Sequence, residues 1–324
     1  MGEIVILMGP PGSGKTTLAR QYYPNHTRCN RDEQGGSTNR PDGEIFQYAR
    51  KMYAEGVRDF VFDNTHPTRE HRAHVIALGQ EFGLPVSCFK VGINIGEAQF
   101  LASIRQVRTT GGLLYAHEYG TTNNAHMFPP MAQLGWFKKL EEPEVGEGFT
   151  EVTVLPFRMD LGPAYTGKAL FLDYDGTLRV TKSGDKWPTD PKDIEILPGR
   201  TDKLQMYLDQ GYILLGVSNQ SGVSRQPGEK GYLTNLMATM CFRETDRLLG
   251  FGPGEIRAHM YAIDRGGPPR SFWRKPCPGM GALAVERFKL DPSQCMVVGD
   301  MKSDATFAAR CGFGFHWAKD FFGV

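Results

Sequence analysis

Residues 4–16 read IVILMGPPGSGKT, an apolar run followed by a glycine-rich stretch and then by a lysine and a threonine. The segment from Glu3 to Met8 has the composition of a buried strand, and the segment from Thr16 to Tyr23 can continue as a helix. In that context the pattern G-x-x-x-x-G-K-[ST] is typical of a loop that binds the phosphates of a nucleoside triphosphate. The sequence therefore predicts a P-loop between a strand and a helix of a parallel sheet.

The residue types of this loop explain how it would bind phosphate. Glycines allow the backbone N–H groups and the helix N-terminus to face the phosphates, Lys15 neutralises the β and γ oxygens, and Thr16 offers its hydroxyl to Mg²⁺. The alternative is a glycine-rich turn with an incidental lysine. We predict that ATP, or another nucleoside triphosphate, is bound by Gly9, Gly12, Ser13, Gly14, Lys15, Thr16 and Thr17.

The rest of the first half alternates strands with helices. Strands are expected at 60–63, 86–91 and 150–157, and helices at 69–82 and 97–107. Such alternation predicts a parallel sheet. The stretch from Thr109 to Pro130 interrupts the pattern with glycine, asparagine and proline pairs, so we expect a mobile lid or loop beside the nucleotide.

Four polar residues of the first half are candidates for the chemistry. Asp32 can lie opposite the γ-phosphate as the base for an attacking hydroxyl, or can be an ordinary loop or N-cap aspartate. Asp63 ends a strand, where a second acidic group can orient Mg²⁺ or the substrate, and a helix cap is the alternative. Arg105 and Arg108 share one helix face before the lid, and they can stabilise the transferring phosphoryl group or be plain surface charges.

A second stretch, ALFLDYDGTL at residues 169–178, places two carboxylates directly after an apolar strand. Asp173 can attack phosphorus, while Asp175 can protonate the leaving oxygen and later activate water. Two carboxylates beside a phosphate require a divalent cation, and Mg²⁺ suits their hard oxygen ligands. This stretch predicts covalent catalysis of phosphate transfer.

Further polar residues stand near strand ends in the second half. Strands are expected at 212–218 and 295–299, with helices near 201–209, 231–249, 281–288 and 303–311. Ligands bind at the carboxyl edge of an open parallel sheet, so we expect Ser218, Lys275, Asp300 and Asp304 to join Asp173 there. The sequence thus predicts an α/β chain of two parallel-sheet domains, residues 1–157 and 168–324, joined by a linker at 158–167.

Composition and charge agree with this organisation. A chain of 324 residues exceeds the size at which one core usually keeps growing. The net charge is +1 and both halves are nearly balanced, so we expect no long duplex-wrapping surface. Six cysteines without a C-x-x-C pair should be reduced and buried. With no membrane-length apolar run and no signal-peptide start, we expect no membrane partner and a cytoplasmic protein, nuclear if eukaryotic.

Residues 1–157 resemble the kinase module of polynucleotide 5′-kinase/3′-phosphatases. The resemblance rests on Gly9 to Thr16, Asn30-Arg31-Asp32, Val61 to Thr65 with Pro67 and Arg69, and the closing segments 136–139 and 148–149. In that family the aspartate of the N-R-D stretch is the general base acting on the 5′-hydroxyl, which implies this role for Asp32. Where phage-type members have a basic residue that grips the acceptor phosphate, this chain has Gln34-Gly35-Gly36.

The order of the motifs in residues 168–324 resembles the haloacid dehalogenase superfamily of phosphatases, which have a Rossmann-like sheet. The resemblance implies that Ser218 hydrogen-bonds the phosphoryl oxygens and that Lys275 balances the charge of the nucleophile and the phosphate. Asp304 would support Lys275 or the metal. The implied metal ligands are Asp173, Asp175, Asp300 and Asp304.

The substrate is suggested by segments 182–189 and 196–198, which resemble the 3′-phosphatase module of the same family. Histidinol-phosphate and heptose-bisphosphate phosphatases share the later motifs, but many of them carry a cysteine/histidine zinc loop. Here only His259 and Cys277 occupy that region, too few for a tetrahedral zinc site.

A phosphate donor joined to a phosphate remover would together prepare a broken DNA or RNA strand for a ligase. The alternatives are a small-metabolite kinase fused to a sugar-phosphate phosphatase, and a chain in which one half is a degenerate binding module. The sequence does not indicate an oligomeric state. Because nearly neutral halves cannot neutralise many phosphates, we expect few contacts with the strand, from Arg105, Arg108, Arg179, Lys182 and Arg225.

Overall fold

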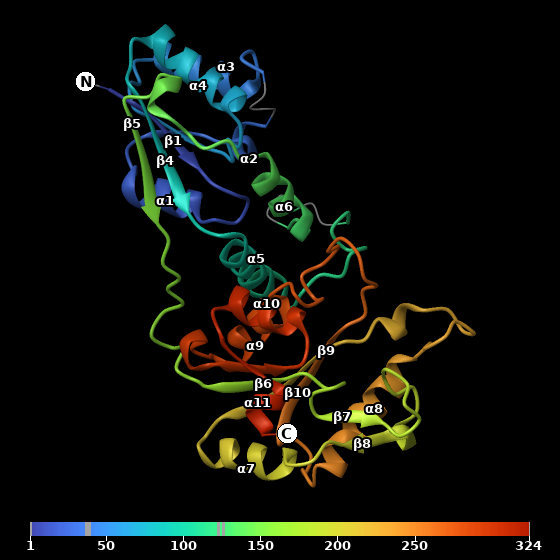
Figure 1. The fold of residues 1–324 in the computed structure, drawn as a ribbon. Coiled ribbons are helices and arrows are strands. Elements are labelled where there is room, and N and C mark those ends of the chain that lie inside the picture. Colours follow the sequence, from blue (N-terminus) through green and yellow to red (C-terminus); the bar gives the residue numbers. More distant parts are fainter. Residues whose placement is uncertain (1, 36–39, 122–123, 125–126, 324) are drawn as a thin grey trace. The chain divides into compact units, whose positions relative to one another are not determined.

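The computed structural model describes residues 2–35, 40–121, 124 and 127–323, and the chain divides into two compact units (Figure 1). The first unit takes residues 1–98 and 122–160, and the second takes residues 99–121 and 161–324. Gly36, and Asn123 of the expected lid, lie outside the described residues. Both units carry a parallel sheet with helices, so the predicted α/β class is confirmed.

The first unit is built on a five-stranded sheet in the order β2-β3-β1-β4-β5, and every pairing in it is parallel. Its central strand is wholly buried, as the apolar composition of IVILM requires when both faces of a parallel sheet are covered. The strands are β1 (Ile4–Met8), β2 (Thr27–Cys29), β3 (Phe60–Asp63), β4 (Val86–Gly92) and β5 (Glu151–Pro156).

Helices cover this sheet, and a core of aromatic and aliphatic side chains such as Phe46, Phe60, Phe62 and Trp136 fills the space between. The helices are α1 (Lys15–Tyr22), α2 (Arg31–Gln34), α3 (Glu44–Ala54), α4 (Arg69–Phe82) and α6 (Pro130–Lys139), with a 3₁₀ turn η1 (Val145–Glu147). Helix α5 (Ile95–Thr110) begins in the first unit, and its residues from Gln99 onward belong to the second.

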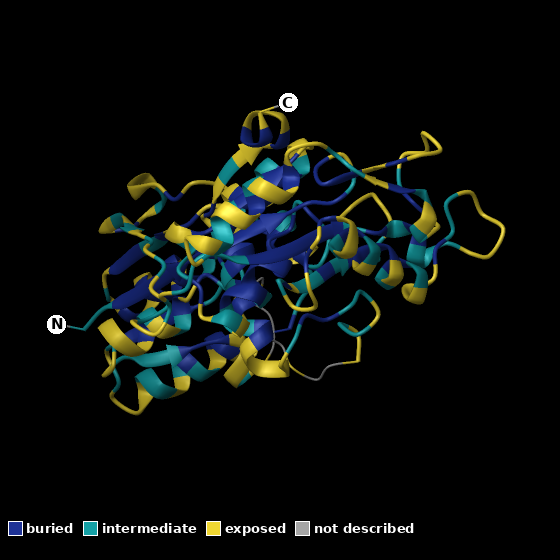
Figure 2. Ribbon diagram, turned by 90° about the horizontal axis from the view of Figure 1, so that it is seen from below, coloured by how far each residue is buried: buried dark blue, intermediate teal, exposed yellow. Residues whose placement is uncertain are grey.

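The second unit has its own five-stranded parallel sheet in the order β10-β9-β6-β11-β12 and a small antiparallel pair, β7-β8. Figure 2 shows buried central strands with helices that alternate between buried and exposed turns. The strands are β6 (Ala169–Leu172), β7 (Arg179–Thr181), β8 (Ile194–Ile196), β9 (Ile213–Asn219), β10 (Ile256–Ala262), β11 (Met296–Gly299) and β12 (Gly314–Trp317). The α-helices are α7 (Arg200–Asp209), α8 (Asn235–Leu248), α9 (Gly279–Phe288), α10 (Lys302–Cys311) and α11 (Ala318–Phe322), and the 3₁₀ turns are η2 (Pro191–Asp193), η3 (Ser221–Ser224) and η4 (Pro292–Gln294).

Residues 109–121 of the expected lid belong to the second unit. The Tyr115 ring stacks on Trp273 with centroids 5.6 Å apart, and Trp273 Nε1 donates to the Leu113 carbonyl at 3.2 Å. An aromatic contact and a hydrogen bond thus attach this part of the expected lid to Trp273, and its mobility stays a prediction.

Two further observations agree with the composition. All six cysteines are buried with free thiols, as predicted. Among the described residues, no helix combines the length and the apolar character needed to cross a bilayer.

Candidate functional site

The P-loop lies between β1 and α1, and two of its glycines adopt a conformation that other residues disfavour. Gly12 has φ 82° and Gly14 has φ 85°, both in the left-handed region. Helix α1 begins immediately afterwards, at Lys15, so its N-terminus opens onto the loop. The Lys15 ammonium is buried and donates to the carbonyls of Gly9 at 3.0 Å and Pro10 at 2.9 Å. The loop therefore holds the lysine beside its own backbone.

Thr16 meets a buried carboxylate from the neighbouring strand. Its hydroxyl donates to Asp63 Oδ2 at 2.7 Å, and Asp63 stands at the end of β3, which pairs with β1. Asn30 Nδ2 donates to the carbonyl of Asp63 at 2.8 Å and to its Oδ2 at 3.1 Å. Helix α4 is capped by Thr68, so Asp63 is not its cap. A hydroxyl and a carboxylate in contact are suitable oxygen donors for Mg²⁺.

Asp32 lies at the adjacent strand end. Asn30 is the N-cap of α2 and accepts from the Asp32 N–H at 2.7 Å, so Asp32 occupies the first turn and is not the cap. Its side chain is exposed, and β2 pairs with β3 in the sheet. Topology thus brings Asp32 to the same edge as Asp63 and the P-loop, and its role as a base stays a prediction.

The two arginines of α5 lie in the second unit. Arg108 Nε donates to Glu286 Oε1 at 2.8 Å, and its Nη2 donates to the Tyr165 hydroxyl at 3.0 Å. Arg105 is half-buried in the same helix. The structure thus gives Arg108 a partner outside the P-loop, and a contribution of Arg105 and Arg108 to phosphoryl transfer stays a prediction.

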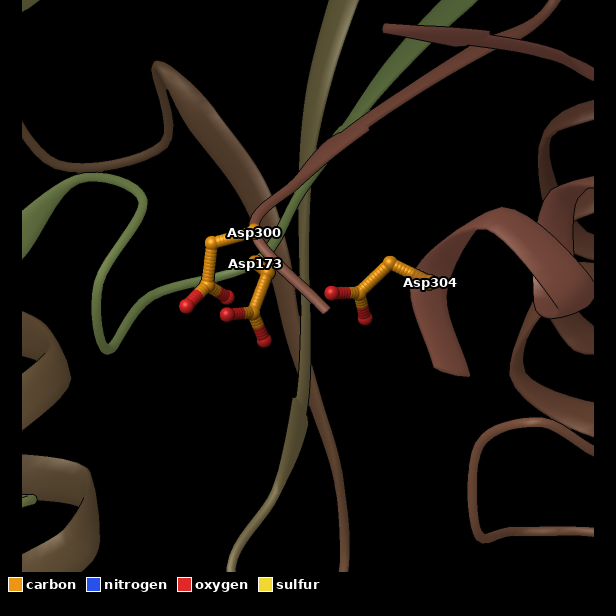
Figure 3. Close-up of side chains that lie close together, drawn as sticks. All are labelled: Asp173, Asp300 and Asp304. Carbon is orange, nitrogen blue, oxygen red and sulfur yellow. The ribbon is translucent and has the colours of Figure 1, made fainter. Parts of the chain in front are cut away.

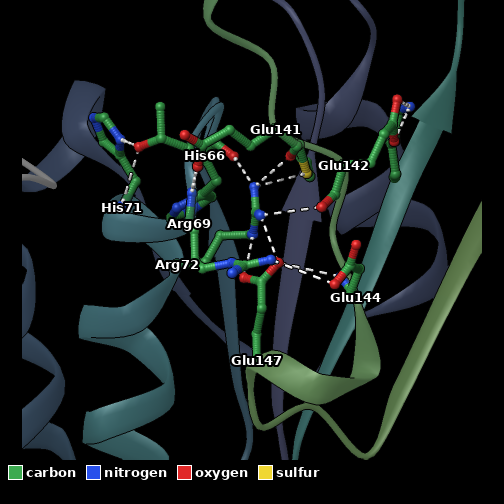
Figure 4. Close-up of polar contacts among 11 residues, drawn as sticks. His66, Arg69, His71, Arg72, Glu141, Glu142, Glu144 and Glu147 are labelled. Carbon is green, nitrogen blue, oxygen red and sulfur yellow. Dashed lines mark hydrogen bonds and ion pairs between the residues drawn. The ribbon is translucent and has the colours of Figure 1, made fainter.

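The buried Arg72 holds the loop that follows Asp63, and we did not predict this residue from the sequence. Arg72 is fully buried and makes a bidentate pair with Glu147, with Nε–Oε2 at 2.8 Å and Nη2–Oε1 at 2.6 Å (Figure 4). Its Nη1 also donates to the carbonyls of Glu141 at 2.9 Å and His66 at 3.3 Å. Arg72 therefore connects α4 with the segment from Glu141 to Glu147 and with the loop after β3.

The second sheet carries a cluster of carboxylates at its carboxyl edge. Asp173 follows β6, Asp300 follows β11 and Asp304 lies in the first turn of α10. Their carboxylate oxygens lie within 4.8 Å of one another, and the three side chains converge in Figure 3. The strand order places β9, β6 and β11 side by side, so the topology produces this cluster.

Lys275 is the cation of the cluster. Its ammonium donates to Asp173 Oδ1 at 2.6 Å and pairs with Asp304 Oδ1 at 2.7 Å. The loop that carries it is fastened to β9 because the Lys275 N–H donates to Asn219 Oδ1 at 3.0 Å and Asn219 Nδ2 donates to the Lys275 carbonyl at 3.1 Å. Gly176 allows the Asp300 carboxylate to approach the loop after β6, since a Cβ at position 176 would stand 2.5 Å from Asp300 Oδ2.

Burial shapes the titration of this cluster. Desolvation raises the pKa of Asp173 to about 7, opposed by Lys275 and assisted by Asp304. Burial and Asp304 also raise the pKa of Asp300. Although burial disfavours its charge, the carboxylates of Asp173 and Asp304 hold the pKa of Lys275 above its ordinary value. Three carboxylates against one ammonium leave excess negative charge, so a divalent cation fits these oxygen donors.

The Asp175 carboxylate is held apart from this cluster. Arg179 Nε donates to its Oδ1 at 2.8 Å and Gln220 Nε2 donates to its Oδ2 at 3.1 Å. Gln220 also donates to the Ser218 hydroxyl at 2.8 Å, which places that buried serine beside the same cavity. The position suits an acid/base group, and a metal-binding role for Asp175 stays a prediction.

Arg179 is not the surface contact that we expected, because its side chain is only 1% exposed. It points inward from β7 toward Asp175, as the buried, exposed, buried pattern of that strand requires. The expectation that it binds strand phosphates is therefore wrong. An arginine four residues after Asp175 was the only sequence signal for this contact.

His259 and Cys277 stand in the region where many histidinol-phosphate and heptose-bisphosphate phosphatases carry a zinc loop. His259 contacts the Tyr174 hydroxyl and pairs with Asp246 at 3.0 Å, while Cys277 is buried. Among the described residues, the one cluster of at least three histidine, cysteine, aspartate or glutamate side chains that could share a metal ion is Asp173, Asp300 and Asp304.

Comparisons with known proteins agree with this two-part site. Residues 168–322 match the family described as polynucleotide kinase 3 phosphatase, and residues 4–98 match the family described as AAA domain. A bifunctional polynucleotide phosphatase/kinase of Schizosaccharomyces pombe is 30% identical over 164 residues, which make up 48% of this chain. The chain thus joins a domain that matches the AAA domain family to a polynucleotide kinase 3 phosphatase domain. It spans about a third of the S. pombe relative, since the match covers 34% of that protein.

Another curated relative and a solved structure can also be compared with the chain. A D-glycero-beta-D-manno-heptose-1,7-bisphosphate 7-phosphatase of Helicobacter pylori is 30% identical over 147 residues, or 43% of this chain and 76% of that protein. A chain of the solved Pnkp1/Rnl/Hen1 complex is 17% identical with a TM-score of 0.32, and the match covers 98% of this chain and 96% of that chain.

Proposed function

We propose that this protein heals nucleic-acid ends by phosphorylating 5′-hydroxyls and removing 3′-phosphates. One observation carries the proposal: each sheet has, at its carboxyl edge, its own set of groups for handling a phosphate. Lys15, Thr16 and Asp63 supply that set in the first unit, and Asp173, Lys275 and Asp304 supply it in the second. Joining the two activities serves a broken strand, because ligation needs a 5′-phosphate and a 3′-hydroxyl.

In the kinase reaction, the backbone of the P-loop and Lys15 hold the phosphates of ATP or another nucleoside triphosphate. Asp32 accepts the proton of the 5′-hydroxyl, whose oxygen then attacks the γ-phosphorus as the bond to the nucleoside diphosphate breaks. Mg²⁺, held through Thr16 and Asp63, would neutralise the developing charge. Arg105 and Arg108 would add positive charge to the transferring group.

In the phosphatase reaction, an Asp173 oxygen attacks the 3′-phosphorus and the bond to the 3′-oxygen breaks as Asp175 protonates that oxygen. Water then attacks the aspartyl-phosphate, Asp175 takes its proton, and inorganic phosphate leaves. Ser218 hydrogen-bonds the phosphoryl oxygens and Lys275 balances their charge. Mg²⁺, held by Asp173, Asp300 and Asp304 with Asp175 as a further ligand, would supply charge neutralisation at the phosphate.

The rim of the phosphatase cavity favours a nucleotide over a sugar. The cavity has a volume of about 540 Å³, and Trp187 is among its lining residues. The Arg225 guanidinium lies 5.5 Å from the centroid of the Trp187 ring, and Lys186 and Lys182 are exposed nearby in the sequence. An aromatic ring beside cations can stack on a base while the cations meet phosphates. A ligase is the expected collaborator, in the cytoplasm or in a eukaryotic nucleus.

An oligonucleotide with 5′-hydroxyl and 3′-phosphate ends tests the proposal directly. Lys15→Ala and Asp32→Ala should remove 5′ phosphorylation and leave 3′ dephosphorylation near wild type, while Asp173→Asn should do the reverse. Loss of a catalytic group should lower the affected rate by at least about a hundredfold. Matched surface changes, Lys51→Ala on α3 and Asp209→Asn on α7, should preserve both activities.

Two outcomes would contradict the proposal. Loss of both activities from one of these folded variants would exclude independent sites. Turnover of small sugar phosphates in preference to the oligonucleotide end would support the metabolic fusion instead.

A further inference from the structure

Arg179 is a buried charged residue that lies beside two aromatic rings. It begins β7, its side chain is 1% exposed, and its guanidinium lies 5.1 Å from the Tyr174 ring centroid and 5.4 Å from that of Phe242. A buried guanidinium is costly unless a counter-charge and hydrogen-bond acceptors surround it. Arg179 forms an ion pair with the Asp175 carboxylate, with Nε 2.8 Å from Oδ1.

The remaining hydrogen bonds of the Arg179 guanidinium join it to helix α8. Its Nη1 donates to the Cys241 carbonyl at 2.8 Å and to the Thr245 hydroxyl at 2.7 Å, both on α8. Thr245 is itself buried and donates to the Cys241 carbonyl at 2.8 Å. Arg179 is therefore fixed to a packed helix on one side and to the Asp175 carboxylate on the other.

This arrangement makes the two oxygens of Asp175 unequal. Oδ1 accepts from Arg179 Nε and Oδ2 accepts from Gln220 Nε2, and both donors line the same cavity as Ser218. The donor to Oδ1 is a positively charged guanidinium, whereas the donor to Oδ2 is a neutral amide. The positive charge disfavours a proton on Oδ1 more strongly than the amide disfavours one on Oδ2, so Oδ2 is the better place for the proton that Asp175 delivers and later accepts.

We propose that Arg179 is a positioning residue that fixes the Asp175 carboxylate so that Oδ2 serves as its proton-transfer atom. The inference rests on the phosphatase half of the proposed function, and it concerns any phosphate ester with an alkoxide leaving group. In the first step the bond from phosphorus to the ester oxygen breaks, a bond to Asp173 forms, and the Oδ2 proton passes to the departing oxygen. In the second step water attacks phosphorus, its proton returns to Oδ2, and the bond to Asp173 breaks.

Two substrates whose leaving groups differ in basicity can distinguish a positioning role of Arg179 from a role in stability alone. Release of p-nitrophenolate needs no proton, whereas release of a 3′-alkoxide does. Single-turnover rates should be measured with a 3′-phosphorylated oligonucleotide, and the first-turnover burst of nitrophenol with p-nitrophenyl phosphate. In Arg179→Met, an unbranched apolar side chain fills the space without the donor, and the oligonucleotide rate should fall about a hundredfold while the burst falls less than about threefold.

Two further variants keep the test decisive. Arg179→Lys can pair with Asp175 or with the Cys241 carbonyl and should restore part of the oligonucleotide rate. If Arg179→Met does not fold, the ratio of the two rates in Arg179→Lys decides the question in the same way. Arg200→Met is the matched control, because Arg200 is also buried but donates to the carbonyls of Thr177 and Pro198. It should lower both rates by one common factor.

An equal loss on both substrates in folded Arg179 variants would overturn the inference, because a structural role alone lowers both rates together. Failure of the proposed substrate is distinguishable. If wild type hydrolyses a sugar phosphate and not the oligonucleotide, the same ratio is measured with that alkyl ester.

Discussion

The Arg72–Glu147 pair offers a stability prediction whose size follows from the structure. Both side chains are almost fully buried, at 0% and 2% exposed, and two parallel hydrogen bonds of 2.8 and 2.6 Å join them. Removing one partner of such a pair leaves an uncompensated buried charge and costs about 3–5 kcal/mol. Arg72→Met also leaves the carbonyls of Glu141 and His66 without this donor, so the cost should lie at the upper end.

Arg69→Met is the matched control on the same helix. Arg69 is 61% exposed and pairs with Glu144 at 3.3 Å and with Glu147 at 3.8 Å. An exposed pair of this kind contributes about 0–1 kcal/mol. The two arginines thus meet the same glutamate, and burial is what distinguishes them.

The assay is urea unfolding of the whole chain, with kinase and phosphatase activities followed alongside fluorescence. Because Arg72 belongs to the first unit, kinase activity should be lost at lower urea in Arg72→Met, while phosphatase activity should persist as in wild type. The double variant Arg72→Met/Glu147→Gln should recover part of the loss, since no buried charge is then left alone. Equal costs for Arg69→Met and Arg72→Met would refute the reasoning.

Three other outcomes are expected. Burial lowers the pKa of His66 from 6.5 to about 3, so below pH 6.5 the unfolded chain binds a proton that the folded unit does not bind. The stability present above pH 6.5 should therefore be lost below it, by up to about 1.4 kcal/mol per pH unit. His66→Phe should flatten this dependence of stability on pH, and equal slopes in the variant and the wild type would contradict the assignment to His66. The phosphatase should need Mg²⁺ and survive a zinc-selective chelator, as the carboxylate cluster implies, and one equivalent of zinc per chain would count against this. Duplex ends should bind with a salt slope of roughly two to four phosphate contacts, measured as log affinity against log salt, and a much steeper slope would exclude recognition limited to the terminus.

Much of the fold could be predicted because its signals are local. The helix 69–82 and the strand 60–63 were predicted at their observed bounds, and the P-loop stands where the strand and helix signals required it. Helix α3 was outside the predicted set, although its buried Ile45, Phe46 and Ala49 form a helical apolar face. Strands β10 and β12 were also missed, because they lie at the two edges of their sheet and β12 is largely exposed.

In the candidate sites, too, some features could be predicted from the sequence and others could not. Asp173, Lys275, Asp300 and Asp304 were predicted from strand ends, and the cluster of three carboxylates around one ammonium confirms that they meet. Contacts that depend on side-chain direction were not predictable. The sequence does not show that Arg179 points from β7 toward Asp175, or that Arg108 donates to Glu286, and the kinase role of Arg108 stays a prediction.

The sequence by itself determined the chemistry and the class of fold, since glycine spacing, apolar runs and paired aspartates are properties of consecutive residues. Only the tertiary structure decided which charges are buried and which oxygen each donor meets. Arg72 and Arg69 stand three residues apart, yet one is enclosed and the other faces water. The reason is physical: the free energy of a charge depends on its solvation and on its neighbours, and packing brings those neighbours from distant parts of the chain.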